Sequence, residues 1–302
     1  MAKKGNRIAL QSAPENVIGE SAVEACRRLA RRHDFERYLA TLFAPRRRRP
    51  ALWILLAFNA EIARTRQIVS EAALGQIRLQ WWREAVDTAV ADGPVRQHEV
   101  AAPLAAALRA GALEPALLHR LIDGRARDLD DAPMADEAAL LDYAAQTGGA
   151  LAEAMALAAG GGPADPETRR AARESARALG TGWALAGILR AASFHAGGGR
   201  QLLPQSALAA GGAGPRDLAE RRATAGVRAA AEAVAAMARD RLAAAGRTGG
   251  PADRLLVLKP VALAWLDRLE RAGFDPFGVP DRLAPAHTPA LMLAARWFGR
   301  GL

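Results

Sequence analysis

GTGWALAGILRAASFHAGGGRQLLP, residues 180–204, forms a long apolar helical pattern. The pattern extends upstream to Asp165-Pro166-Glu167, which supplies a capping side chain, a proline suited to the first turn and an acid that favours a helix N-terminus. Gly197-Gly198-Gly199 ends it, and this run is no phosphate loop because no strand pattern precedes it and no Gly-Lys-Ser/Thr follows. The sequence therefore predicts one helix from about residue 165 to about residue 194, long enough to cross a whole domain.

Helical periodicity continues along nearly all of the remaining sequence. Ala, Leu and Arg dominate, β-branched residues are scarce, and the alternating pattern of strands is absent. Pro50 suits a first helical turn, and we expect Asp34 and Ser70 to cap helices. We predict an all-α protein with further helices at about residues 15–31, from 34 onward, 50–67, 70–91, 97–110, 115–129, 133–159, 215–245, 252–272 and 288–298. Residues 1–14 are predicted to be a disordered N-terminus, and residues 15–302 one helical domain with a short C-terminal tail helix.

Charge and composition limit the class of protein. The net charge of +9 favours an anionic partner, although a bias toward arginine explains the charge equally well. The Arg46–Arg49 cluster lies between two prolines without interleaved aromatic residues, so we expect a solvated or membrane-facing turn and no nucleic-acid binding. No apolar run approaches the ~18 residues that span a bilayer. The N-terminus lacks the apolar segment of a signal peptide, and a lone Cys26 excludes an internal disulfide. We therefore expect a cytoplasmic protein in a reducing compartment.

Two polar features near helix ends each have a functional and a structural interpretation. Asp128, Asp130 and Asp131 resemble an acid cluster, but they follow a helix, so a solvated turn is favoured. His195 could contact a ligand, but a histidine at a helix end is more often a C-terminal cap that interacts with the helix dipole. We favour the structural interpretation in both cases.

Three other positions involve packing or ion pairs. Glu61 and Arg64 are three residues apart on a helix and are expected to pair. Of the neighbours Trp81 and Trp82, at least one is expected to pack into the core, although a double Trp beside arginine also suits a partner-binding face. For Arg190 the sequence leaves two alternatives open: binding of an anionic head group in a cavity, or a buried ion pair.

Four segments, in order, resemble the squalene/phytoene synthase family: RPALWILLAFNAE (49–61), ALLDYAAQTGG (139–149), residues 180–204 and FDPF (274–277). Together they cover about residues 33–280. The resemblance implies an isoprenoid-synthase-like helical bundle with a central cavity. Members of the family condense prenyl diphosphates with Mg²⁺ ions held by two facing pairs of aspartates. Aspartates four residues apart share one helix face, and Mg²⁺ prefers oxygen ligands.

The sequence departs from this family pattern where the chemistry should be. Ala63, Arg64 and Gln67 align with the first aspartate motif, and Ala191 and His195 align with the second. Arg64 would also put a positive charge where Mg²⁺ is expected. The resemblance therefore implies a catalytically degenerate protein with no catalytic residue, no metal and no other cofactor. The alternative is an active, Mg²⁺-dependent head-to-head prenyl transferase whose metal is held by other carboxylates.

The residues at the degenerate positions resemble one branch of the family. AFNAEIARTRQIVSE (57–71), IRLQWWREAVD (77–87) and LRAASFHAGGGRQLLP (189–204) look like the non-catalytic branch typified by the mitochondrial assembly factor for respiratory complex I. The implied partners are complex I subunits or other assembly factors, without prenyl transfer. The tail at residues 288–302 is expected to lie on an anionic membrane, placing the protein peripherally on its inner face, or to dock on the domain's own exterior.

This resemblance also implies a cavity that binds a lipid or an isoprenoid. The candidate cavity or ligand-binding residues are Asn59, Glu61, Arg78, Tyr143, Arg190 and Arg200.

Overall fold

The computed structural model describes residues 20–160, 165–198, 200–284 and 286–299, and within them the secondary structure is helical, without a strand. The N-terminal segment predicted to be disordered, residues 1–14, lies outside the described residues. The elements of the first half are α1 (Glu20–His33), α2 (Phe35–Thr41), the 3₁₀ turn η1 (Arg46–Arg48), α3 (Arg49–Ala63), α4 (Thr65–Ile68), α5 (Ala72–Val90), α6 (Ala101–Arg109), α7 (Pro115–Ala126), the 3₁₀ turn η2 (Arg127–Leu129) and α8 (Glu137–Ala144). Those of the second half are the π-helical turn η3 (Ala145–Gly149), α9 (Ala150–Ala158), α10 (Pro166–Arg190), α11 (Ala192–Gly197), α12 (Gln205–Ala210), α13 (Pro215–Ala219), α14 (Ala225–Ala244), the 3₁₀ segment η4 (Pro251–Val257), α15 (Leu258–Arg271) and α16 (His287–Phe298). The predicted all-α fold is confirmed.

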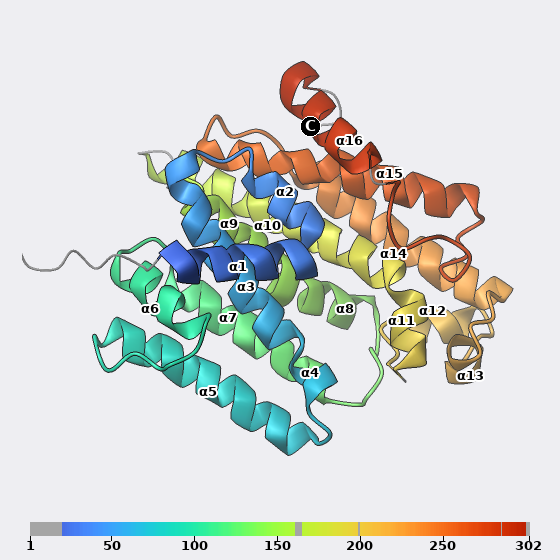
Figure 1. The fold of residues 1–302 in the computed structure, drawn as a ribbon. Helices are drawn as coiled ribbons and strands as arrows, with labels where there is room; N and C mark the ends of the chain where they lie inside the picture. Colours follow the sequence, from blue (N-terminus) through green and yellow to red (C-terminus); the bar gives the residue numbers. More distant parts are fainter. Residues whose placement is uncertain (1–19, 161–164, 199, 285, 300–302) are drawn as a thin grey trace, which may run out of the picture.

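Helix α10 is the centre of the bundle and packs against α14, α9 and α15 (Figure 1). It begins as predicted: the Asp165 carboxylate accepts a hydrogen bond from the Thr168 backbone N–H at 2.8 Å, and Pro166 occupies the first turn. Its C-terminal half is buried on most sides, with Trp183, Leu185 and Leu189 in the core. Residues 180–190 of the stretch that the sequence pattern singled out therefore form part of the innermost helix.

Helix α10 approaches the π-helical turn η3 so closely that neither side has room for a side chain. A Cβ atom added at Gly180 would overlap the Gly148 carbonyl oxygen, and one added at Gly149 would lie 2.7 Å from the Thr181 hydroxyl. The predicted helix over residues 133–159 is therefore interrupted between α8 and α9 by one wide turn. Asp136 caps α8 by accepting from the Ala139 N–H.

Three predicted helices continued too far. The chain turns at Ala191, so α10 ends at Arg190 and α11 is a separate short helix. Likewise α3 ends at Ala63, and α4 is a separate turn of helix. The segment predicted as one helix over 215–245 contains α13 and α14, because Arg221 adopts a positive φ of 53°. The sequence does not mark these breaks, because good helix formers such as alanine and arginine continue through them.

Two predicted caps are wrong. Asp34 occupies the N-cap position of α2, but its carboxylate makes no capping hydrogen bond and instead pairs with Arg37 at 2.8 Å. The N-cap of α5 is Glu71, not Ser70, and it also makes no capping side-chain bond. In both cases the helix begins without the local bond that the sequence offered.

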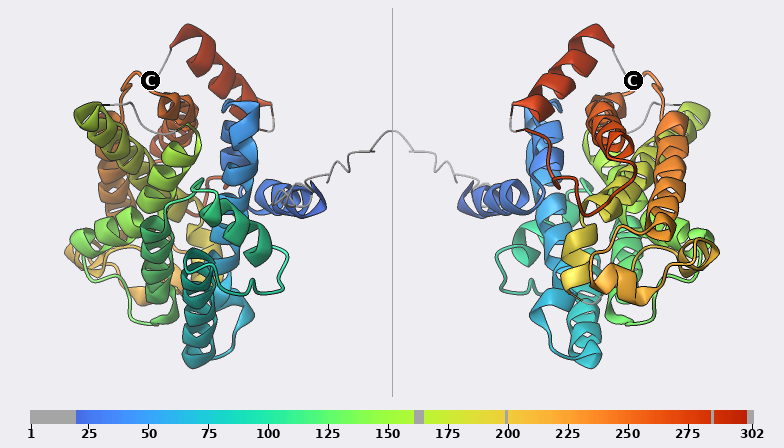
Figure 2. Two further views of the ribbon diagram at one scale, coloured as in Figure 1. Left: turned by 90° about the vertical axis from the view of Figure 1, so that its left-hand side faces the viewer. Right: turned by 90° about the vertical axis from the view of Figure 1, so that its right-hand side faces the viewer.

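Helices α5 and α16 lie at opposite ends of the bundle (Figures 1 and 2). Helix α16 docks on α15 and η4 through a buried face that includes Thr288, Met292 and Ala295. Leu293 and Trp297 on the same helix are exposed. No helix in the described part of the chain is long and apolar enough to span a bilayer.

Candidate functional site

A cavity of about 270 Å³ lies beside the C-terminal half of α10. Its walls come from segments far apart in the sequence: α2, α3 and α4 on one side, α7 to α9 on another, and α10, α11 and the following loop on the third. Apolar and small side chains line part of it: Ala63, Leu151, Ala184, Ile188 and Leu202. Charged and polar side chains line the rest: Arg37, Gln67, Arg125, Asp128, Tyr143, His195 and Arg200. The predicted central cavity is therefore present, with an apolar and a basic part.

Asp128 is the centre of the polar part. It is 4% exposed and accepts hydrogen bonds from the Tyr143 hydroxyl and the Arg200 guanidinium, both at 2.7 Å. Arg125, one helical turn earlier, donates to the same carboxylate at 3.3 Å and to the Tyr143 hydroxyl at 3.2 Å. Burial raises the pKa of Tyr143, so its hydroxyl stays protonated and available as a donor. The prediction that Asp128 lies in a solvated turn is wrong, whereas Asp130 and Asp131 are exposed.

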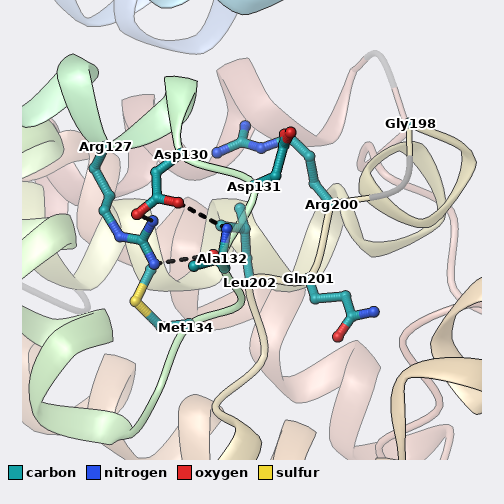
Figure 3. Close-up of a pocket in the computed structure, with 9 residues that line it drawn as sticks. All are labelled: Arg127, Asp130, Asp131, Ala132, Met134, Gly198, Arg200, Gln201 and Leu202. Atoms are coloured by element: carbon teal, nitrogen blue, oxygen red, sulfur yellow. Dashed lines mark hydrogen bonds and ion pairs between the residues drawn. The ribbon is translucent and has the colours of Figure 1, made fainter. Parts of the chain in front are cut away.

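Two extended segments bring Arg200 to Asp128. The Met134 N–H donates to the Gln201 carbonyl at 3.2 Å, and the Gln205 N–H donates to the Met134 carbonyl at 2.8 Å. Behind this pairing lies a small hollow of about 30 Å³, where Arg127, Asp130 and Ala132 are joined by hydrogen bonds on one wall and Arg200 and Gln201 come from the other segment (Figure 3). Arg127 pairs with Asp130 at 2.7 Å. The two backbone hydrogen bonds hold the segment that carries Arg200 beside the segment that follows η2.

His195 faces the cavity from α11. Burial, assisted by the nearby Arg200 charge, lowers its pKa to about 4, so the imidazole is neutral at pH 7. Its Nδ1 is buried and has no hydrogen-bond partner among the described residues. His195 does lie in the last turn of a helix, as predicted, but its neutral ring contributes no charge to the helix dipole and its Nδ1 bonds no helix carbonyl.

Only some residues aligned with the aspartate motifs reach this cavity. Ala63 and Gln67 line it from α3 and α4, and His195 lines it from α11. Arg64 lies outside, where it pairs with Glu61 at 2.5 Å, and Ala191 lines a different hollow. The break at Ala191 separates the two residues of the second motif.

Glu61 is a buried carboxylate that pairs with two half-buried arginines. As predicted, it pairs with Arg64, and its second oxygen accepts from Arg78 at 2.6 Å. Asn59, on the same helix, is buried, and its Oδ1 lacks a hydrogen-bond partner among the described residues. The three cavity candidates here, Asn59, Glu61 and Arg78, do not line the central cavity. The ion pairs of Glu61 instead join α3 to α5.

Arg190 lines an open groove of about 660 Å³ next to the cavity. Its guanidinium pairs with Glu36 at 2.7 Å and donates to the Asp281 carbonyl at 2.8 Å. Of the two alternatives for Arg190, the structure therefore supports the ion pair. Trp183 and Gly187 line both the groove and the cavity, so they form the wall between them.

Sequence reasoning missed Arg37 and Arg125 as cavity residues. Arg37 pairs with Asp34 and lies over the Trp183 ring at 5.6 Å. Arg125 and Asp128 are three apart at the end of α7, a spacing that could have indicated their contact. Of the predicted candidates, Tyr143 and Arg200 do line the cavity. Trp82 is fully buried, as expected for one of the paired tryptophans.

The Mg²⁺ ions that the fold implies do not fit this donor set. Asp128 is the one carboxylate among the described cavity residues, and two guanidiniums already contact it. Mg²⁺ requires several oxygen ligands in near-octahedral geometry. Among the described residues no group of three or more His, Cys, Asp or Glu side chains is arranged to hold a metal.

Comparison with known proteins places this cavity in a familiar fold. A family model described as squalene/phytoene synthase matches residues 30–290. Among solved structures, a dehydrosqualene synthase superposes with a TM-score of 0.77 at 15% identity, covering 93% of this chain and 98% of that one. Squalene synthase HpnC from Alicyclobacillus acidocaldarius gives a TM-score of 0.71 at 23% identity, covering 84% and 95%. At these identities the likeness concerns the fold alone.

The curated relatives found by sequence are named as complex I assembly factors and not as synthases. The mouse protein "NADH dehydrogenase (ubiquinone) complex I, assembly factor 6" is 30% identical over 256 residues, which are 83% of this chain and 75% of the mouse protein. The bovine protein of the same name is 36% identical over 135 residues. That match spans 44% of this chain and 40% of the bovine protein's length.

Proposed function

This chain belongs to the squalene/phytoene synthase family, and we propose that within it the protein assists the assembly of respiratory complex I and does not transfer prenyl groups. Relatives that match most of the chain carry the name complex I assembly factor 6. Its partners are then complex I subunits or other assembly factors.

The observation that carries the loss of catalysis is the composition of the cavity. Head-to-head prenyl transfer must stabilise a departing diphosphate, which the family achieves with Mg²⁺ held by aspartates. Here Ala63, Gln67 and His195 lie at the aligned positions that reach the cavity. Asp128, the one carboxylate among the described cavity residues, is held by arginines. A neutral wall and an occupied carboxylate supply no ligand set for the metal.

The proposed site of action is the inner face of a membrane, with the protein bound peripherally. Helix α16 supports this placement, because Leu293 and Trp297 (76% exposed) lie one turn apart on its outer side, with the exposed Arg296 beside them. Apolar side chains next to a cation suit the interface of an anionic bilayer. The net charge of +9 acts in the same direction.

Deleting the gene in its own organism tests the assembly role. We expect lower NADH:ubiquinone oxidoreductase activity and accumulation of subassemblies on native gels, both restored by the wild-type gene. Unchanged activity and assembly would refute the proposal. Purified protein with farnesyl or geranylgeranyl diphosphate and excess Mg²⁺ is expected to release no diphosphate; turnover would establish the alternative, a Mg²⁺-dependent prenyl transferase.

Liposome flotation tests the membrane role separately. Vesicles containing anionic lipid should carry the wild-type protein upward, and Trp297→Ser should reduce the bound fraction. Ile77→Ser removes a similarly exposed apolar side chain (66% exposed) from α5 at the far end of the bundle and should leave binding unchanged. Equal loss in both variants, or no binding of the wild type at physiological salt, would contradict the assignment to α16.

A further inference from the structure

One face of the bundle, formed by α1, α3, α4 and α5, carries an excess of positive charge. These helices contact one another in sequence and lie along the same side of the molecule (Figure 1). Arg28, Arg31 and Arg32 are three and four residues apart, so they share the outer side of α1. All three are exposed, and none forms an ion pair within the described ranges. Such a row of uncompensated cations attracts an anionic partner.

His33, at the end of α1, connects this row to α3. Its Nε2 lies 3.4 Å from the Nη1 of Arg64. Partial burial lowers the pKa of the His33 imidazole, and the charges of Arg64 and Arg32 lower it further. The ring is therefore neutral at pH 7, and cations from α1 and from the end of α3 lie close to the same side chain.

Glu61 is the carboxylate between α3 and α5 on this face. Arg64 and Arg78 both contact it, at 2.5 and 2.6 Å. Arg78 uses only Nη2 in this contact, so its Nη1 has no bond among the described residues and is available as a donor. With the exposed Glu71 at the N-cap of α5 counted as well, five arginines and two carboxylates leave an excess of three positive charges.

Beside this charge, α4 and α5 expose apolar side chains. Ile68, Leu74 and Ile77 are between 47% and 66% exposed. Leu74, Ile77 and the half-buried Trp81 are three and four residues apart, so they form one stripe along α5. Leu74 and Arg78 are neighbours four residues apart on the same helix, so the stripe borders the basic residues.

Charge and spacing together decide what fits this face. A stripe with helical spacing packs against the apolar face of another helix. A second copy of this chain would bring its own arginines, because a twofold axis places the same surface against itself, and like charges oppose that contact. The membrane contact proposed for α16 lies at the other end of the bundle from α5 (Figures 1 and 2). A helix with carboxylates beside its apolar face satisfies both the stripe and the charge.

We propose that this face docks an acidic amphipathic helix of a partner protein. Its apolar side chains cover Leu74 and Ile77, and its carboxylates lie toward Arg32, Arg64 and Arg78. The proposal rests on the proposed assembly function, which requires protein partners, and it names the chemistry of one of them.

Site-specific photo-crosslinking in the protein's own organism tests the occupant. The full chain with p-benzoylphenylalanine in place of Ile77 is expressed in the deletion strain and irradiated, and the adducts are identified by mass spectrometry. We expect a protein adduct whose crosslinked peptide belongs to an acidic amphipathic helix. The same group in place of Leu293, exposed on α16, should not give this adduct. An adduct only with lipid, nucleic acid or a second copy of this chain, or no adduct, would overturn the proposal.

The crosslinked segment, made as a synthetic peptide, then allows affinities to be measured by fluorescence anisotropy. Ile77→Ser should weaken binding at least about tenfold, because an apolar contact is lost. Arg32→Glu should weaken it about fivefold, and added salt should reduce this difference. The matched control, Arg241→Glu, reverses the charge of an exposed arginine on α14, which lies outside this face, and should bind as the wild type. Wild-type affinity in both Ile77→Ser and Arg32→Glu would overturn the site.

Complementation separates this proposal from the assembly function. Ile77→Asp places a charge in the stripe at an exposed position, so it should keep the wild-type Tm but fail to restore complex I in the deletion strain. A deletion without any effect on complex I would refute the assembly function, whatever binds this face. A deletion phenotype that Ile77→Asp restores fully would refute only the docking face.

Discussion

Replacing Asp128 by Asn tests the central claim about the cavity. The substitution keeps the shape of the side chain but removes the charge that both Arg125 and Arg200 contact. Tyr143 can still donate to the amide oxygen, so the hydrogen bond to the hydroxyl is retained. Two guanidiniums would then remain in the cavity without a carboxylate.

The expected loss follows from burial. Removing one partner of a buried ion pair destabilises a protein by about 3–5 kcal/mol. The Arg125 and Arg200 side chains are 18% and 25% exposed, so water screens part of the remaining charge. We therefore expect the lower end of that range, about 3 kcal/mol. At about 2 °C per kcal/mol, this corresponds to a fall in Tm of roughly 6 °C.

Urea denaturation followed by circular dichroism measures this change in unfolding free energy. Asp131→Asn is the matched control: the same exchange in the same loop, at a carboxylate that is 84% exposed and paired with Arg66. It should lose less than about 0.5 kcal/mol. Adding Arg125→Met to Asp128→Asn should restore part of the stability by removing an unpaired charge. Equal, small losses for both single variants would refute the buried pairing.

Three further predictions concern the core and titratable groups. Gly180→Ala should lower Tm and cost about 2 kcal/mol of unfolding free energy, because the added methyl group overlaps the Gly148 carbonyl. Gly187→Ala on the same helix meets no such neighbour and should raise the unfolding free energy by about 0.5–1 kcal/mol. Similar Tm shifts in the two variants would contradict the close approach of α10 and η3. Burial lowers the pKa of His195 from about 6.5 in the unfolded chain to about 4 in the folded protein. Between these two values the unfolded chain binds a proton that the folded protein does not bind, so the unfolding free energy decreases as the pH falls from 6.5 toward 4. The unfolding free energies of wild type and His195→Gln, measured at pH 7 and pH 5, should therefore differ less at pH 5; a constant difference would disprove the shift. Burial raises the pKa of Cys26 to about 12, so iodoacetamide should label it at pH 8 only after denaturant is added, and rapid native labelling would show that the thiol is accessible.

Local features of the sequence were sufficient for much of the fold. The cap at Asp165, the proline in the first turn of α10 and the Glu61–Arg64 pair each involve residues within one helical turn. Apolar periodicity located most helices for the same reason, because one helix face repeats every few residues. The family resemblance then identified the cavity and two of its polar residues, Tyr143 and Arg200.

The breaks between helices and the centre of the site depended on tertiary structure. The ends of α3 and α10 lie within stretches of good helix formers that contain no proline or glycine, and Arg190 just before one break contacts Asp281, 91 residues away. Asp128 looked like its exposed neighbours Asp130 and Asp131, because carboxylates in one turn are indistinguishable in a local pattern. Packing alone buries Asp128 and brings Arg200 to it across 72 residues of sequence. The sequence by itself therefore determined most of the helices. Which charged side chains line the cavity was decided by the tertiary structure, because contacts between distant segments exclude water from some carboxylates and leave others exposed.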